Sequence, residues 1–281
     1  MLGCYICNAS DLIRKRDQMS SFVEVRHIIY SYPGNTNNTL NNCSLYMKKG
    51  DMLCILGPNG IGKSTLLNCI CGLLVPKQGE ILINNLNINK MTPRSIAQHI
   101  GYVQQSQIYS FGYTIIDYVL MGRANNVGLF HKPSEYDRKK AEDALKLVGI
   151  NHIATALITE VSGGERQLAS IARVIAQEPQ IILLDEPTAH LDYGNQIRIL
   201  KLIKTLNKRG YSILMTTHNP DHCIMLNARV GIFDKTGTLT VGICEQMLSD
   251  DKLSELFGAR IRMVYAESVK RNTFVFENIE D

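Results

Sequence analysis

Eight consecutive residues, 57–64, have the types and spacing needed to hold the phosphate groups of a nucleotide. Their sequence, GPNGIGKS, fits the pattern G-x-x-x-x-G-K-[ST]. Glycines let backbone N–H groups turn toward phosphate oxygens, a lysine can reach the β- and γ-phosphates, and a serine hydroxyl can bind Mg²⁺. We therefore predict a nucleotide and Mg²⁺ as cofactors, with Ser64 as a metal ligand. The predicted nucleotide-binding residues of this loop are Gly57, Pro58, Asn59, Gly60, Ile61, Gly62, Lys63, Ser64 and Thr65.

A second candidate for chemistry is the carboxylate pair Asp185–Glu186, which directly follows four apolar residues. Parallel strands deliver their last residues to the carboxyl edge of a sheet, where α/β proteins bind ligands. Asp185 can hold Mg²⁺ there, directly or through water, and Glu186 can orient or deprotonate an attacking water. The alternative is a solvated acidic pair at a strand end. The phosphate loop elsewhere in the chain favours the catalytic interpretation.

Short apolar runs and helical spacings predict the elements that must position these residues. The runs 52–56, 181–184 and 212–217 are typical of buried parallel strands. Further strands are predicted at 22–30 and 80–88, and helices at 64–74, 134–149 and 163–177. Strands that alternate with helices indicate an α/β fold with a mostly parallel sheet. Residues 106–165 carry little strand signal, so we predict an inserted α-helical subdomain there.

Composition excludes several classes of protein. With 281 residues, of which 45% are hydrophobic, the chain can build a core and is too apolar to be disordered. No apolar run reaches the length of a membrane helix, and a net charge of +4 does not argue for nucleic acid as a partner. The first residues lack the order of a signal peptide, so a cytoplasmic location is expected.

The segment VSGGERQ, residues 161–167, makes the chain resemble the ATP-binding subunits of ABC transporters. It is similar to their LSGGQ signature, with Val161 for leucine and Glu165 for glutamine. The resemblance implies a P-loop NTPase core of the RecA-like type with an additional antiparallel β part. It also implies that ATP held by the phosphate loop of one subunit is closed over in trans by Ser162, Gly163, Gly164, Glu165 and Asp192 of the other subunit.

The resemblance assigns further roles position by position. Tyr32 falls where an aromatic ring stacks on adenine, and the segment AHLD ending at Asp192 is similar to the D-loop. Gln105 resembles the glutamine that touches Mg²⁺ and the transport partner, although Gln104 is an alternative. His218, after TT, resembles the switch histidine that contacts the γ-phosphate. The implied catalytic set is thus Glu186, His218, Gln105 and Lys63, and the implied metal ligands are Ser64, Gln105 and Asp185.

A further motif, DKTGTLT at residues 234–240, is the phosphorylation sequence of P-type ion pumps. In such a pump the aspartate would become an aspartyl-phosphate. The chain has no apolar spans for a pump, and the motif lies between two strand-like runs, 230–233 and 239–242. We therefore predict a β-hairpin with Lys235, Thr236 and Gly237 at its turn.

The segments 113–123 and 245–258 resemble the importer branch that takes up iron-siderophore, haem, cobalamin or molybdate. This resemblance implies an ATP hydrolase that dimerises over two ATP molecules at the cytoplasmic face of the membrane. Its partners would be a second copy, a multi-span permease that docks near residues 105–131 and, indirectly, an extracytoplasmic substrate-binding protein. An iron-siderophore is the expected cargo, and a soluble ABC ATPase of the iron–sulfur cluster assembly type remains the alternative. The expected divisions are an N-terminal extension at 1–18 that is dispensable, the ABC ATPase domain at 19–265 and a tail at 266–281.

Overall fold

A computed structural model describes residues 22–105, 112–127 and 131–276. The predicted extension at 1–18 lies outside this range. None of the helices in the described part of the chain is both long and apolar enough to cross a membrane.

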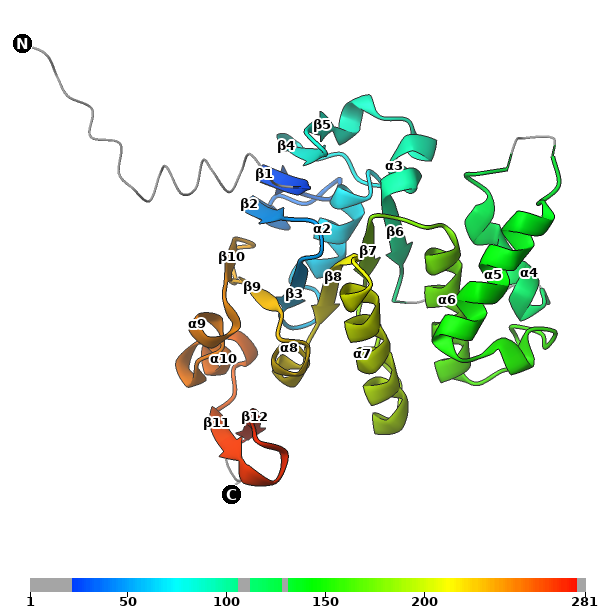
Figure 1. The fold of residues 1–281 in the computed structure, drawn as a ribbon. Helices are drawn as coiled ribbons and strands as arrows, with labels where there is room; N and C mark the ends of the chain where they lie inside the picture. The colour runs from blue at the N-terminus through cyan, green and yellow to red at the C-terminus, as the bar shows by residue number, and fades with distance from the viewer. Residues whose placement is uncertain (1–21, 106–111, 128–130, 277–281) are drawn as a thin grey trace, which may run out of the picture.

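The centre of the molecule is a six-stranded sheet with the order β10-β9-β3-β8-β7-β6 (Figure 1). Its strands are β3 (Met52–Leu56), β6 (Ile100–Val103), β7 (Ile181–Leu184), β8 (Ser212–Thr217), β9 (Arg229–Phe233) and β10 (Leu239–Gly242). All neighbours are parallel except β9 and β10, which form the predicted hairpin. This confirms the α/β class with a mostly parallel sheet.

Both faces of the central sheet are covered, which explains the continuous apolar runs in the sequence. Leu53 and Ile55 of β3 join one hydrophobic cluster, whereas Cys54 and Leu56 of the same strand join another on the opposite face. Successive side chains of a strand point to opposite faces, so a strand buried on both sides needs an apolar residue at every position.

One cluster lies between the central sheet and a four-stranded antiparallel sheet with the order β2-β1-β4-β5. The strands of this second sheet are β1 (Val23–Tyr30), β2 (Leu40–Met47), β4 (Gln78–Ile83) and β5 (Leu86–Asn87). Helix α2 (Lys63–Ile70) contributes buried leucines to the same cluster. The predicted antiparallel part is therefore present, and it lies over the helix that follows the phosphate loop.

The other cluster joins the remaining face of the sheet to helices, of which α4, α5 and α6 lie together beside β6 (Figure 1). The helices around the sheet are α3 (Pro93–His99), α4 (Ile115–Leu120), α5 (Glu135–Val148), α6 (Gly163–Ala176), α7 (Tyr193–Lys208) and α8 (Pro220–Leu226). Single 3₁₀ turns follow or connect them at η1 (Ile88–Lys90), η2 (Met121–Arg123) and η3 (Asn151–Ile153). The described part of residues 106–165 is mainly helical, as the sequence predicts.

Helix α5 shows why its ends could be read from the sequence. Ser134 and Asp137 cap each other's backbone N–H groups at the start, and Gly149, with φ 74°, ends the helix in the left-handed region.

Two predicted elements differ from the elements in the structure. The helix predicted at 64–74 stops at Ile70, because Gly72 adopts φ 71° and the chain turns there. The strand predicted at 80–88 is split into β4 and β5 by Asn84 and Asn85, which both have positive φ. Asparagine tolerates this conformation in tight turns, so the apolar alternation on both sides hid a hairpin.

The C-terminal part consists of α9 (Cys244–Met247), α10 (Asp250–Phe257) and a separate hairpin, β11 (Ile261–Ala266) and β12 (Arg271–Phe276), with η4 (Glu267–Val269) between them. The hairpin is attached to α8, since Thr273 Oγ1 donates a 2.9 Å hydrogen bond to Asp221. The predicted tail at 266–281 therefore includes the second half of this hairpin.

The pump-like motif forms the turn between β9 and β10, and its aspartate is bonded within that turn. Asp234 Oδ1 accepts hydrogen bonds from Thr236 N, Thr236 Oγ1 and Thr238 N at 2.6–3.0 Å. These bonds lower the pKa of Asp234 even though burial opposes them. The carboxylate acts as the internal acceptor of a tight turn.

We expect Asp234→Asn to retain ATPase activity within about twofold, because the Asp234 carboxylate makes its hydrogen bonds within its own turn. The change should cost about 1 kcal/mol of stability, since an amide oxygen replaces a charged acceptor. A phosphate-release assay and a urea titration measure the two effects. Abolished hydrolysis in a folded variant would instead revive the phospho-aspartate interpretation.

Candidate functional site

The phosphate loop connects the end of β3 to the start of α2, as the sequence predicts. Gly62 precedes the helix with φ 115°, and a Cβ on it would lie 3.0 Å from the carbonyl oxygen of Thr39. Only glycine fits both restrictions, because that φ strains other residues and the neighbouring backbone cannot move away. The loop is thereby held at the N-terminus of α2, where helix N–H groups favour anions.

Three side chains from different elements meet at this loop. Lys63 Nζ lies 2.8 Å from Glu186 Oε1, and Glu186 Oε2 lies 3.0 Å from His218 Nδ1. Lys63 also donates to the carbonyl oxygens of Gly57 and Pro58, at 2.7 and 2.9 Å. Lys63 and Glu186 are buried, whereas the His218 side chain is 54% exposed. The structure thus brings together three of the four predicted catalytic residues.

The electrostatics of Glu186 follow from these partners. The hydrogen bond with His218 and the contact with Lys63 lower the pKa of Glu186 to about 2, although burial acts in the opposite direction. Glu186 therefore remains a carboxylate at neutral pH and can accept a hydrogen bond from water.

Asp185 is held by two hydroxyl groups that sequence analysis did not assign. Thr216 Oγ1 donates to Asp185 Oδ1 at 2.7 Å, and the Tyr102 hydroxyl donates to Oδ2 at 3.3 Å. Asp185 is 3% exposed at the carboxyl end of β7. A threonine inside an apolar strand is the only signal in the sequence that could have indicated Thr216.

The donor set suits Mg²⁺, which prefers oxygen ligands and keeps few of them from protein. Asp185 and Ser64 would supply a carboxylate and a hydroxyl. Among the described residues no group of three or more His, Cys, Asp or Glu side chains could hold a metal. When bound, Mg²⁺ would neutralise charge on the β- and γ-phosphate oxygens.

Tyr32 lies beside the first turn of α2. Its hydroxyl is 3.1 Å from Thr65 Oγ1, and its ring stands edge-on to Tyr30 with the centroids 5.2 Å apart. Tyr32 is 40% exposed as a residue. Adenine stacking on Tyr32 remains a prediction.

Gln104 and Gln105 follow β6 and are both exposed. The parallel register pairs Val103 with Leu184, so the two glutamines leave the sheet beside Asp185 and Glu186. No hydrogen bond joins either glutamine to the described site residues. The choice between them stays open.

Comparisons with known proteins identify the family. Residues 40–189 match the protein family described as ABC transporter. The chain is 34% identical over 240 residues to the molybdate import ATP-binding protein MolC of Haemophilus influenzae, covering 85% of this chain and 89% of the relative. This chain belongs to the ABC transporter family. It is therefore an ATP-binding domain whose hydrolysis of ATP is coupled to transport, and the soluble cluster-assembly alternative is disfavoured.

Solved ABC proteins share the fold. An inward-facing ABC transporter of the metal-chelate type has a chain that is 31% identical, with a TM-score of 0.82, covering 92% of this chain and 98% of that one. The dimeric ATP-binding cassette MJ0796, bound to ADP and Pi, is 29% identical, with a TM-score of 0.68, covering 79% of this chain and 98% of that one.

The ABC signature of this chain begins α6 and lies among the helices beside the sheet, apart from α2 (Figure 1). Ser162 and Glu165 form a reciprocal cap: Ser162 Oγ donates to Glu165 Oε2 at 2.7 Å and accepts from Glu165 N at 3.3 Å. The Ser162 bonds lower the pKa of Glu165, which is thus a carboxylate at the helix start. Within one chain the signature residues do not contact the phosphate loop. The trans arrangement with Gly163 and Gly164 remains a prediction.

The D-loop lies beside the switch histidine. Asp192 caps α7 through Asn195, and a cavity of about 420 Å³ lies between the D-loop and the segment from His218 to His222. His222 is buried, and burial lowers its pKa to about 4, so its neutral ring can pair with Thr217 Oγ1 at 2.9 Å.

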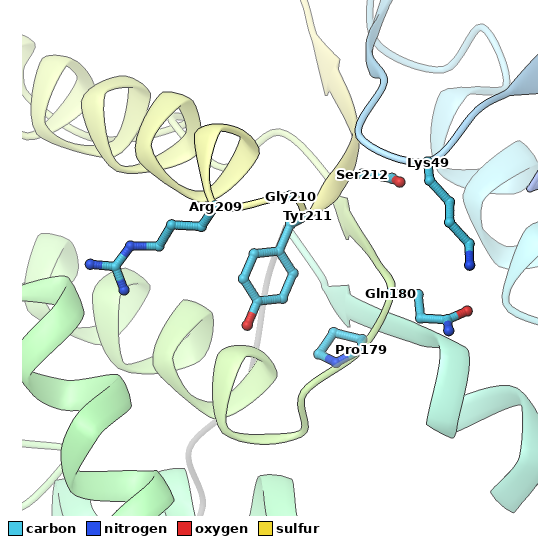
Figure 2. A pocket seen from close by; sticks show the side chains of 7 residues that line it. All are labelled: Lys49, Pro179, Gln180, Arg209, Gly210, Tyr211 and Ser212. Carbon is cyan, nitrogen blue, oxygen red and sulfur yellow. The ribbon is translucent and has the colours of Figure 1, made fainter.

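A different pocket lies at the opposite, amino-terminal edge of the sheet, where β7 and β8 begin (Figure 2). It is lined by Lys49, Pro179, Gln180, Arg209, Gly210, Tyr211 and Ser212. The Arg209 side chain points away from Lys49 and Gln180, so the two cations do not converge. None of the predicted site residues lines this pocket.

Proposed function

We propose that two copies of this chain form the ATP-hydrolysing part of an importer for a metal chelate, with Glu186 as the residue that activates water. The observation that carries the site assignment is the Lys63–Glu186–His218 arrangement. It gathers a phosphate-binding cation, a carboxylate acceptor and a polar ring on the carboxyl edge of one sheet.

The low pKa of Glu186 fits a two-stage use of this carboxylate. While Lys63 is paired with it, Glu186 is a poor base, because a carboxylate with a pKa of about 2 holds protons weakly. When Lys63 instead binds phosphate oxygens of ATP, Glu186 loses one cationic partner and becomes more basic. Hydrolysis is then favoured only after the nucleotide is in place.

In this proposal ATP joins two subunits, since the signature residues do not reach the phosphate loop of their own chain. Ser162, Gly163, Gly164, Glu165 and Asp192 would meet the nucleotide held by the partner copy. The closed pair binds ATP more tightly than the open pair does, so binding of ATP favours closure. Hydrolysis then reopens the pair. The dimeric state of the relative MJ0796 supports this arrangement.

The surface that would receive the permease is a groove of about 780 Å³ between α3 and the α4–η2 segment. Its floor is largely apolar, and Leu120, Met121 and Ala124 line it beside Arg94. Arg94 Nε donates to Asn125 O at 3.0 Å and so connects the two walls. Most of the residues that line the groove belong to the region 105–131 that was expected to meet the transport partner, and α3 supplies the other wall. The groove would hold one short helix of a membrane protein. The chain then works at the cytoplasmic face of the membrane, with a substrate-binding protein on the other side.

Replacing Met121 with Glu tests the groove. Met121 is 41% exposed, and a charge there should prevent an apolar helix from binding. We expect at least a tenfold loss of copurification with membranes, whereas hydrolysis by the purified subunit should stay within about twofold.

Met263→Glu is the matched control, because Met263 is also a methionine with 40% exposure but lies on β11, away from the groove. Equal membrane binding by the two variants would contradict the proposed docking surface. If the wild-type chain captures no multi-span membrane protein at all, its assignment as an importer subunit fails.

The cargo is proposed from likeness alone. An iron-siderophore is the first choice, because the relatives include a probable iron chelatin transport ATP-binding protein of Helicobacter pylori. Haem, cobalamin and molybdate are the others, and the likenesses also include a molybdate importer and a metal-chelate type transporter. Uptake of labelled ferric siderophore and of labelled molybdate, in cells with the wild-type chain or Glu186→Gln, distinguishes these cargoes. The true cargo should accumulate only with the wild-type chain.

A further inference from the structure

The backbone at Glu186 is strained. Glu186 has φ 44°, in the left-handed region that residues other than glycine rarely adopt. Such a conformation costs about 1–3 kcal/mol and persists only where surrounding contacts impose it.

A side chain of the neighbouring strand is bonded to this backbone position. β7 and β8 are parallel, with Leu184 beside Met215, so Thr216 lies beside Asp185. Glu186 N donates to Thr216 Oγ1 at 2.8 Å, and Thr216 Oγ1 donates to Asp185 Oδ1 at 2.7 Å. The direction of both bonds is fixed, because a backbone N–H can only donate and a carboxylate oxygen can only accept.

One hydroxyl group therefore fixes two carboxylate residues at once. It orients the Asp185 side chain directly and holds the backbone of Glu186 at the point where the chain turns. Thr216 is fully buried, so water does not compete for either bond. From this backbone position the Glu186 side chain reaches both Lys63 and His218.

We propose that Thr216 is a positioning residue for hydrolysis, which holds Glu186 in its strained conformation and keeps Asp185 in register with it. The inference rests on the proposed role of Glu186. In this proposal Thr216 acts through Asp185 and Glu186 rather than on the nucleotide or the reacting water. Its effect is to place the carboxylate that does.

The test is Thr216→Val, which keeps the branched shape and removes the hydroxyl. A displaced carboxylate should lower kcat for ATP about 10- to 100-fold, because misplacement of a catalytic group by about 1 Å has effects of this size. KM for ATP should change less than kcat does, because Lys63 keeps its bonds to the carbonyl oxygens of Gly57 and Pro58 and the loop keeps its place at the start of α2. Thr216→Ser retains a hydroxyl and should restore at least about half of kcat.

Ser212→Ala is the matched control for simple destabilisation. Ser212 is a buried hydroxyl residue at the other end of β8, beside the pocket of Figure 2. Like Thr216 it makes two hydrogen bonds, which in this case are to Gly50 N and Lys48 O. Ser212→Ala should lower Tm about as much as Thr216→Val does, yet keep kcat within about twofold.

Each outcome of the series is decisive. If Thr216→Val keeps kcat within twofold, or if Thr216→Ser is as impaired as Thr216→Val, the proposal is overturned. Glu186→Gln, assayed alongside, separates this failure from that of the site itself. A normal rate for Glu186→Gln removes the proposed base and the positioning role with it, whereas an inactive Glu186→Gln beside an active Thr216→Val removes only the latter.

Discussion

Glu186→Gln should hydrolyse ATP about 10²- to 10³-fold more slowly than the wild-type chain, because general base assistance contributes factors of this order. An amide keeps the size of the side chain and a hydrogen-bonding oxygen, but it cannot take a proton from water. Binding of ATP through Lys63 and the loop should persist, so the variant should accumulate as an ATP-bound dimer. Phosphate release and the molar mass in saturating ATP measure the two effects.

Asp234→Asn is the control for this variant, since it also converts a carboxylate to an amide but lies in the β9–β10 turn. It should hydrolyse ATP and not accumulate as a dimer. If Glu186→Gln remains monomeric in saturating ATP and hydrolyses at the normal rate, Glu186 is not the base.

Glu186→Gln should also change how the free energy of unfolding depends on pH when no nucleotide is bound. The pKa of Glu186 falls from 4.5 to about 2 on folding. A lowered carboxylate pKa adds stability that is fully present above pH 4.5 and is lost as the pH falls toward 2. The shift corresponds to about 3 kcal/mol at neutral pH. Glu186→Gln should therefore lose about 2–3 kcal/mol at pH 7, and urea titrations below pH 4.5 should show the difference shrinking.

Replacing Arg123 with Leu should destabilise the protein by about 3–5 kcal/mol, the largest effect that we expect outside the nucleotide site. The Arg123 side chain is 2% exposed and lies between Asp137 and Glu178, at 3.0 and 2.8 Å. It also donates to the carbonyl oxygen of Ala176 at 2.7 Å. These bonds connect η2, α5 and the end of α6. Their loss leaves Asp137 Oδ1 and the carbonyl oxygen of Ala176 without the donor residue that they share, whereas Glu178 keeps Lys140.

Lys140→Ala is the control for this variant. Lys140 also pairs with Glu178, but its side chain is 31% exposed, so its removal should cost less than about 1 kcal/mol. Urea titrations of both variants give the comparison. Equal stabilities would show that the buried position of Arg123 adds nothing to the pairing.

Local chemistry explains which parts of the fold could be predicted. The strands 52–56, 181–184 and 212–217 were confirmed because a strand covered on both faces must be apolar throughout. The ends of α5 were visible because caps are made by neighbours in sequence. The split of the strand predicted at 80–88 was missed, because positive φ at two asparagines is not encoded by an apolar pattern.

The family and its nucleotide chemistry were determined by the sequence alone. Nucleotide binding and hydrolysis require the residue types found at Gly62, Lys63, Asp185 and Glu186. The spacing within each motif is set by a single strand, turn or helix. What only the tertiary structure decided is the support of these residues. Thr216 and Arg123 act on groups that lie 30 and 55 residues away in the chain, and such partners meet only because parallel strands and packed helices bring distant segments together.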